Sequence, residues 1–125
     1  MSIFGMEGLI KANLSIYFDT IKRGVDHSSA IFMVLKTRYP LSSSKRREVE
    51  SFWRGARKAE LQSEKNQPPT RKDLEMAELK DLIHSMYSVE THLDRTDVFK
   101  RIKENEKFDS EFNKLYDSLK IKYSK

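Results

Sequence analysis

The sequence predicts an all-α protein, a compact bundle of about five helices that forms a single domain over residues 1–125. Three observations support this class. Apolar residues recur every three or four positions along most of the chain, which is the period of a helix with one buried face. The one run that is apolar on all sides, residues 30–35, has no second strand candidate to pair with, so a helix satisfies its backbone groups best. A chain of 125 residues, 38% hydrophobic and 10% aromatic, is large enough to bury a core without disulfides.

The composition excludes several classes of site. The chain has no cysteine, so disulfides, thiolate nucleophiles and cysteine-rich metal centres are ruled out. No apolar run approaches the roughly 18 residues of a membrane-spanning helix, and the N-terminus lacks the pattern of a secretory signal. We therefore expect a cytoplasmic protein without membrane association. The four glycines form no phosphate-binding loop.

The first two elements are predicted to be helices of the core. Residues 3–22 carry apolar side chains at helical spacing. Residues 28–38 are predicted to form an 11-residue buried helix, with Asp26 or Ser28 as its N-cap. This helix should end before the Tyr-Pro dipeptide that follows it, because the residue that precedes a proline avoids helical backbone angles.

The third predicted element is a long basic helix over residues 44–65. When its residues are placed at 100° intervals, the apolar side chains fall on one face and the cations on the opposite face. Trp53 lies within the apolar stripe, so we expect it to pack in the core rather than stack on a partner. Serine hydroxyls at the start can cap the first amides of the helix. Residues 66–69, which include two prolines, end this helix and are a candidate hinge within the domain.

A fourth helix is predicted to start directly after the two prolines. Thr70 and Asp73 have the spacing of a capping box, which places the start of the helix at residue 70 or 71. Apolar residues then recur at helical spacing up to about residue 93.

The remainder of the chain is predicted to contain a short helical piece, a bridge and a last helix. Asp97 is expected to cap the short piece, and the highly charged residues 103–107 form the bridge. Phe108 and Asp109 have the pattern of a hydrophobic residue and an N-cap that precede a helix. The last helix is therefore expected to begin after Asp109 and to dock through its regular apolar stripe.

We find no catalytic or metal-binding pattern in the sequence. Asp81 and His84 have the spacing of one half of a di-iron carboxylate motif, but the second half is missing. Both side chains are expected to point to water from the fourth helix. The serines lack an oriented base that would make one of them a nucleophile. The chain is therefore predicted to be non-enzymatic and to use neither a metal nor a cofactor.

Positive charge is concentrated in the middle of the chain. The net charge is +5, but residues 36–72 carry eleven basic and four acidic side chains, whereas residues 73–125 carry ten and twelve. Such a block is typical of a surface that faces an anion, and it is equally typical of an ordinary solvated helix face.

We interpret the basic helix as a nucleic-acid-binding element. The segment 28–38, the tight connection after it and the helix from residue 44 have the outline of a helix-turn-helix, whose second helix enters the major groove of DNA. The turn has a proline in place of the usual glycine, and the second helix is longer than most recognition helices. Contacts to phosphates and base edges are assigned to Ser43, Lys45, Arg46, Arg47, Arg54, Lys58 and Lys65.

The alternative is a protein–protein adaptor, inhibitor or assembly factor. The same cationic stripe would then dock on an acidic surface of a partner protein. Leu9, Ile16 and Tyr87 lie beside the main apolar stripes and are candidates for a partner groove or a homodimer seam, although core packing accounts for them equally well. The sequence leaves open whether the partner is DNA, RNA or an acidic protein.

Overall fold

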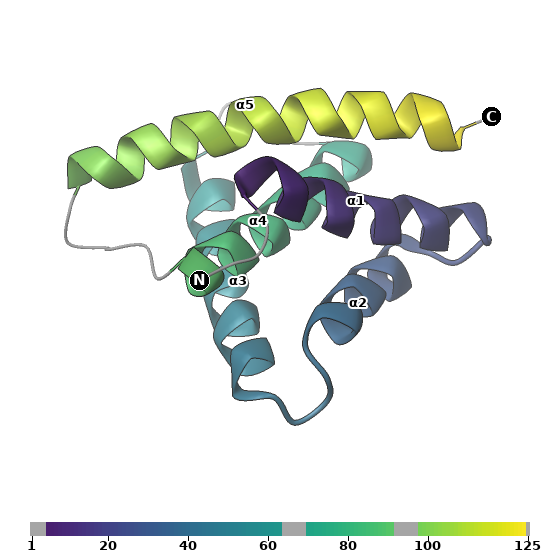
Figure 1. The fold of residues 1–125 in the computed structure, drawn as a ribbon, viewed down its shortest axis with the longest axis horizontal. Helices are drawn as coiled ribbons and strands as arrows, with labels where there is room; N and C mark the ends of the chain where they lie inside the picture. The colour runs from purple at the N-terminus through teal and green to yellow at the C-terminus, as the bar shows by residue number, and fades with distance from the viewer. Residues whose placement is uncertain (1–4, 64–69, 92–97, 125) are drawn as a thin grey trace.

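The chain folds as an arrangement of α-helices, as predicted. The computed structural model describes residues 5–63, 70–91 and 98–124, and its description of side chains leaves out residues 55–63 and 98–101. Within these ranges there are five helices that pack on one another (Figure 1). They are α1 (Met6–Lys22), α2 (His27–Arg38), α3 (Ser44–Ser63), α4 (Arg71–Thr91) and α5 (Val98–Tyr123). The candidate hinge at 66–69 and the expected cap at Asp97 lie outside the described residues.

Two helix pairs form the body of the fold. Helix α1 lies along α5, from the opposite end of the chain, and α3 packs against α4, the helix that follows it (Figure 1). Helix α1 also contacts α2 and α4, which joins the two pairs. Helices α2 and α3 are not among the principal contacting pairs, and they diverge from the connection between them.

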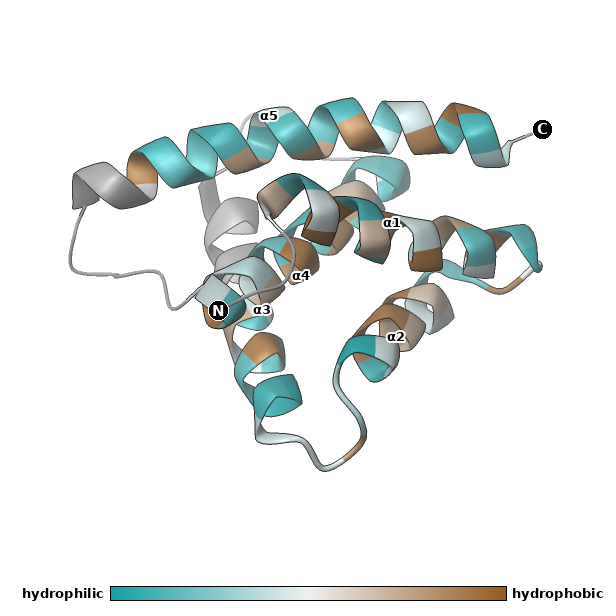
Figure 2. Ribbon diagram, in the orientation of Figure 1, coloured by the Kyte–Doolittle hydropathy of each residue, from teal (hydrophilic) through white to brown (hydrophobic). Residues whose placement is uncertain are grey.

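A single core cluster draws buried side chains from all five helices. The burial of apolar surface contributes roughly 25 cal/mol per Å², which makes this cluster the main source of stability. Most residues of α5 are hydrophilic and hydrophobic residues recur at intervals along it, as expected for a helix with one face on the core (Figure 2). The cluster consists of Leu9, Ile10, Leu14, Tyr17, Phe18, Ala30, Ile31, Val34, Leu35, Tyr39, Val49, Leu79, Leu82, Ile83, Met86, Val89, Phe108, Phe112, Leu115 and Leu119.

Aromatic rings form the seam between α1 and α5. Phe108, Phe112 and Tyr116 follow one another at intervals of four residues, and successive ring centroids lie 6.1 and 5.8 Å apart. From α1, the ring of Phe18 lies 5.2 Å from that of Tyr116 and 6.2 Å from that of Tyr123. Offset and edge-on aromatic contacts of this kind add to the energy of burial, so the seam fixes α5 on α1.

The predicted helix starts are confirmed by their capping contacts. Oδ1 of Asp26 accepts a hydrogen bond from the backbone N–H of Ser29 at 2.9 Å. This bond lowers the pKa of the Asp26 carboxyl. Thr70 and Asp73 form the expected capping box: the N–H of Asp73 donates to Oγ1 of Thr70 at 3.1 Å, and the N–H of Thr70 donates to Oδ2 of Asp73 at 3.3 Å.

The prediction of a buried second helix is wrong in part. Helix α2 has 12 residues rather than 11 and ends before Tyr39, as expected. Ala30, Ile31, Val34 and Leu35 are buried, but Phe32 and Met33 are 45% and 41% exposed. The reason is that α2 contacts α1 and α4 on one side only, so the opposite side of an apolar helix faces solvent.

The prediction of a break before the last helix is also wrong. Helix α5 is continuous from Val98 to Tyr123, so Phe108 and Asp109 lie in its middle. Phe108 is fully buried, and Asp109 pairs with Lys80 of α4 at 3.0 Å instead of capping a helix. Lysine and glutamate, which dominate residues 103–107, are good helix formers, and docking on α4 holds this stretch in helical form.

Two side chains expected to face water from α4 are covered instead. Asp81 is only 9% exposed, and the ring of His84 lies 4.6 Å from that of Phe108. Helix α4 is covered by α3 on one side and approached by α1 and α2, and the Phe108 ring of α5 reaches it as well, which leaves it little free surface. The candidates for a partner groove also belong to the core: Leu9 is buried, and Ile16 and Tyr87 pack against the cluster.

Candidate binding surface where α2 meets α3

A tight turn connects α2 to the basic helix. The N–H of Ser43 donates to the carbonyl of Pro40 at 3.0 Å, which closes a four-residue turn. Ser42, the third residue of the turn, has a φ of 76°, in the left-handed region that favours glycine. Leu41 stands at the tip of the turn and is 57% exposed. The turn therefore presents an apolar side chain to solvent between the two helices.

Ser43 caps the basic helix. Its Oγ accepts a hydrogen bond from the N–H of Lys45 at 3.2 Å, and its carbonyl accepts one from the N–H of Arg47 at 3.4 Å. These are the bonds of an N-cap serine, so the predicted capping by a serine is confirmed. The hydroxyl of Ser43 is thus engaged within the chain.

A half-buried polar contact ties the end of α2 to α4. The hydroxyl of Tyr39 donates to Oε1 of Glu90 at 3.0 Å, and the guanidinium of Arg38 pairs with the same carboxylate. Burial, reinforced by the charge of Glu90, raises the pKa of Tyr39 well above its usual range. Because a half-buried ion pair holds its geometry better than an exposed one, this contact fixes the direction in which the turn leaves α2.

Two of the predicted site residues are engaged by side chains of this chain. Nε of Arg46 lies 3.5 Å from Oε1 of Glu50, and its guanidinium carbon lies 5.2 Å from the centre of the Phe32 ring. With 16% of its side chain exposed, Arg46 serves mainly as a bridge between α2 and α3. Lys45 approaches Glu48 at 3.9 Å, but both side chains are exposed, so this pair is weak and Lys45 stays accessible.

Arg47 and Arg54 form the outward row of cations on α3. Both are exposed, and neither forms an ion pair with a side chain that the structure describes. Their spacing of seven residues places them on the same face of the helix, about 10.5 Å apart along its axis. Lys58 lies on α3, but its side chain is outside the described ones, and Lys65 lies outside the described residues.

Exposed apolar side chains that the sequence pattern did not predict lie on α2 and in the turn before α3. Phe32 and Met33 belong to the exposed side of α2, together with Lys36 one turn later. Residues 30, 31, 34 and 35 form one helical face, so a helix that packs on one side only had to turn residues 32 and 33 outward. We define the α2–α3 corner as Phe32, Met33, Lys36, Leu41, Lys45 and Arg47.

The geometry departs from a helix-turn-helix. In that motif the two helices pack on each other and the second is free to enter a groove. Here α3 packs along α4 instead, and its bridge to α2 is the contact between Arg46 and Phe32. In the described part of the chain, no three His, Asp or Glu side chains come together as a metal site would require, and no helix is both long and apolar enough to cross a membrane.

Comparison of the chain with protein-family models, with curated proteins and with solved structures gives no match in any of the three. The α2–α3 corner combines an aromatic ring, a methionine and a leucine with three basic residues, and aromatic residues, methionine and arginine are enriched at protein interfaces.

Proposed function

We propose that this chain is a non-enzymatic protein-binding module, and that the α2–α3 corner docks an acidic segment of a partner protein that also carries apolar side chains. The observation that supports this proposal is the exposure of Phe32, Met33 and Leu41 on α2 and on the turn that leads into the basic helix, where Lys45 and Arg47 are accessible. Aromatic residues, methionine and arginine are enriched at the centres of protein interfaces. A partner with alternating acidic and apolar residues would match both features.

The expected affinity is weak. Complete burial of a large apolar side chain contributes about 1.5–3 kcal/mol, and Phe32 and Met33 are already half-buried, so each offers roughly 1 kcal/mol. The loss of translational and rotational freedom on association opposes binding by at least about 4 kcal/mol. Three apolar contacts are therefore insufficient alone, and the cations of the corner must add attraction and specificity. These contacts support only weak binding, in the millimolar range (about −4 kcal/mol) at best.

A second candidate function is the binding of a nucleic-acid backbone through Arg47 and Arg54. The observation that favours it is that both guanidinium groups are exposed on one face of α3. Their separation of about 10.5 Å corresponds to three nucleotide steps of about 3.4 Å. Because Arg46 is engaged with Phe32 and Glu50, such contacts would be to phosphates and would carry little base specificity.

Selection from a random peptide library tests the first candidate. Peptides that bind the wild-type chain are expected to carry Asp or Glu among Leu, Phe or Trp. Their affinity, measured by fluorescence polarisation, should fall at least tenfold for the Phe32→Ser/Met33→Ser variant. Ile121→Ser removes an exposed apolar side chain of α5 and should leave the affinity unchanged. A selection without such peptides, or equal losses in both variants, would overturn the proposal.

Titration with nucleic acid tests the second candidate. A labelled single strand and a labelled duplex are titrated at two salt concentrations with wild type and with Arg47→Ala/Arg54→Ala. Two phosphate contacts predict that log affinity falls with log salt at a slope steeper by about 1.4 to 1.8 in the wild type than in the variant. Because both side chains are exposed, the free energy of unfolding of the variant should lie within about 0.5 kcal/mol of the wild-type value. An equal salt slope in both proteins would exclude this candidate.

A further inference from the structure

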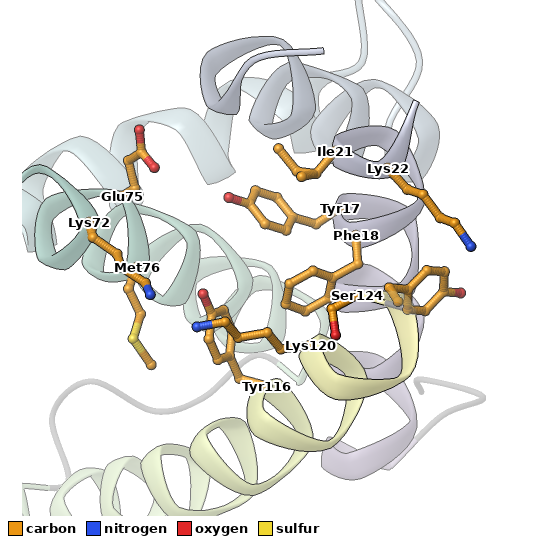
Figure 3. Close-up of a pocket in the computed structure, with 11 residues that line it drawn as sticks. Tyr17, Phe18, Ile21, Lys22, Lys72, Glu75, Met76, Tyr116, Lys120 and Ser124 are labelled. Carbon is orange, nitrogen blue, oxygen red and sulfur yellow. The ribbon is translucent and has the colours of Figure 1, made fainter. Parts of the chain in front are cut away.

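A cavity of about 260 Å³ lies between the start of α4 and the C-terminal ends of α1 and α5 (Figure 3). None of its lining residues belongs to the α2–α3 corner, so it is a separate feature of the molecule. The cavity is lined by Tyr17, Phe18, Ile21, Lys22, Lys72, Glu75, Met76, Tyr116, Lys120, Tyr123 and Ser124.

The walls of the cavity are aromatic and fixed in place. The Phe18 ring packs against the rings of Tyr116 and Tyr123, with the Tyr17 ring edge-on at 5.3 Å on its other side. Tyr17 is held further by its hydroxyl, which lies 2.8 Å from Nδ1 of His27. These contacts order the rings whether or not a ligand is bound, so little entropy is lost when one binds.

Positive charge dominates the rim. Lys22, Lys72 and Lys120 come from three different helices, and Glu75 is the acidic residue among the lining side chains. Oε1 of Glu75 already lies 3.4 Å from Nε of Arg71. Three lysines and one glutamate therefore give the mouth of the cavity a net positive charge, although Asp117 also lies near Lys120.

Two of these lysines lie next to each other. Figure 3 shows the side chains of Lys72 and Lys120 ending close together beside the ring of Tyr116. The close approach of Lys72 lowers the pKa of Lys120 below its usual range. Lys72 also lies in the first turn of α4, where the helix dipole disfavours a cation. Both repulsions would be relieved by one anion placed between the two ammonium groups.

We propose that this cavity binds a small organic anion, with its apolar or aromatic body against Phe18, Met76 and Tyr116 and its carboxylate or phosphate between Lys72 and Lys120. The volume is slightly below the roughly 300–1,000 Å³ of sites for drug-sized ligands, so a ligand of one or two fused rings or a short chain fits best. Aromatic walls give the site affinity for the body of the ligand, and the paired lysines select for its charge.

Calorimetric titration with three matched naphthalene compounds tests this proposal. 2-Naphthoate and 1-naphthyl phosphate carry an anion, whereas 2-naphthamide has a similar body without charge. We expect at least one anion to bind ten times or more tightly than the amide, and the stronger of the two anions identifies the preferred headgroup. Binding of all three with equal affinity, or of none, would overturn the proposal.

Charge-removing variants locate the anion. Lys72→Met/Lys120→Met keeps the apolar stems of both side chains and removes their charge. It should weaken anion binding at least tenfold and leave the amide unaffected. The matched control Lys11→Met/Lys107→Met removes two exposed charges that do not line the cavity, so its anion affinity should equal that of the wild type. Equal losses in the two double variants would mean that only the net charge matters, and the site would be rejected.

Methyl NMR separates this site from the α2–α3 corner. In protein labelled at its methionine methyl groups, 2-naphthoate should shift the resonance of Met76, which lines the cavity, and not that of Met33, which is exposed on α2. A shift of Met33 without a shift of Met76 would place the ligand at the corner and would contradict the proposal. Because the two reporters are independent, failure of this site leaves the protein-binding proposal standing.

Discussion

The hydroxyl of Tyr17 lies 2.8 Å from Nδ1 of His27, and the other ring nitrogen of His27 lies 3.5 Å from Oε2 of Glu78. These three side chains come from α1, α2 and α4, and they meet where α2 begins. The imidazole side chain is only 9% exposed, so its polar partners must come from the protein. This contact holds α2 on the core and fixes the Tyr17 ring in the wall of the cavity.

We predict that Tyr17 and His27 are energetically coupled. His27→Leu leaves the hydroxyl of Tyr17 buried without its partner and should lower the free energy of unfolding by about 1–3 kcal/mol. Tyr17→Phe removes the hydroxyl itself. In urea unfolding at pH 7, the loss in the double variant should be smaller than the sum of the two single losses by about 0.5–1.5 kcal/mol. Strictly additive losses would show that the two groups do not interact.

A second prediction concerns the loss of stability at alkaline pH that follows from the raised pKa of Tyr39. Its pKa is raised in the folded state, first by burial and then by the charge of Glu90, whereas an unfolded tyrosine ionises near pH 10. A raised pKa means that its contribution to stability is complete below about pH 10. The contribution falls as the pH rises further, because the unfolded chain releases the phenolic proton first.

The melting temperature measured from pH 8 to pH 11 checks this sign. Tyr39→Phe loses the hydrogen bond to Glu90, so it should melt lower than the wild type at pH 8. It should also lose less further stability than the wild type between pH 10 and pH 11. Tyr123→Phe removes a phenol from α5 that has no such contact with Glu90, and it serves as the control. A steeper alkaline decline in Tyr39→Phe than in the wild type would refute the assignment.

The turn between α2 and α3 supplies a third prediction. Ser42 has a φ of 76°, and the left-handed conformation raises the energy of an ordinary residue by roughly 1–2 kcal/mol. Ser42→Gly relieves this strain but adds freedom to the unfolded chain, so the free energy of unfolding should change by less than about 1 kcal/mol. Ser42→Val places a β-branched residue in the same conformation and should be destabilising by at least about 1 kcal/mol.

Leu41→Val is the matched control, since it places the same residue at the adjacent exposed position of the turn, where φ is not positive. Chemical denaturation of the four proteins gives the comparison. If valine is tolerated equally at both positions, the turn does not hold Ser42 in the left-handed region.

Local chemistry explains why much of the helical order was predictable. The caps formed by Asp26, Thr70 and Asp73 involve atoms no more than three residues apart, so the sequence contains all the information that places them. Local chemistry also accounts for the end of α1 just before Gly24, which takes a φ of 89°. These features do not depend on which helix packs against which.

The surface of the candidate site was predictable only in part. The outward direction of Arg47 and Arg54 follows from helical periodicity, which agrees with their exposure in the structure. The engagement of Arg46 depends on Phe32, fourteen residues earlier, and the exposure of Phe32 depends on which side of α2 faces the core. Tertiary packing determines both features, and the spacing of apolar residues in the sequence does not show which helices pack together. The paired lysines of the cavity were missed for the same reason, because Lys72 and Lys120 are far apart in the chain.

The continuity of α5 is the clearest departure from the sequence pattern, and it leads to the last prediction. Glu106 is exposed and lies in the stretch that was expected to be a bridge between two helices. In a continuous helix, Glu106→Gly should cost about 1 kcal/mol relative to Glu106→Ala, and Glu106→Pro about 3 kcal/mol or more. A bridge between separate helices would tolerate all three substitutions almost equally. Urea unfolding of the three variants distinguishes the two cases.

Because Phe108 is fully buried only two residues later, a proline at position 106 should also loosen its packing, which the near-ultraviolet circular dichroism of the folded protein would report. Equal stability of the proline and alanine variants would show that the helix is interrupted there, and that the docking of Phe108 on α4 does not require the turn before it.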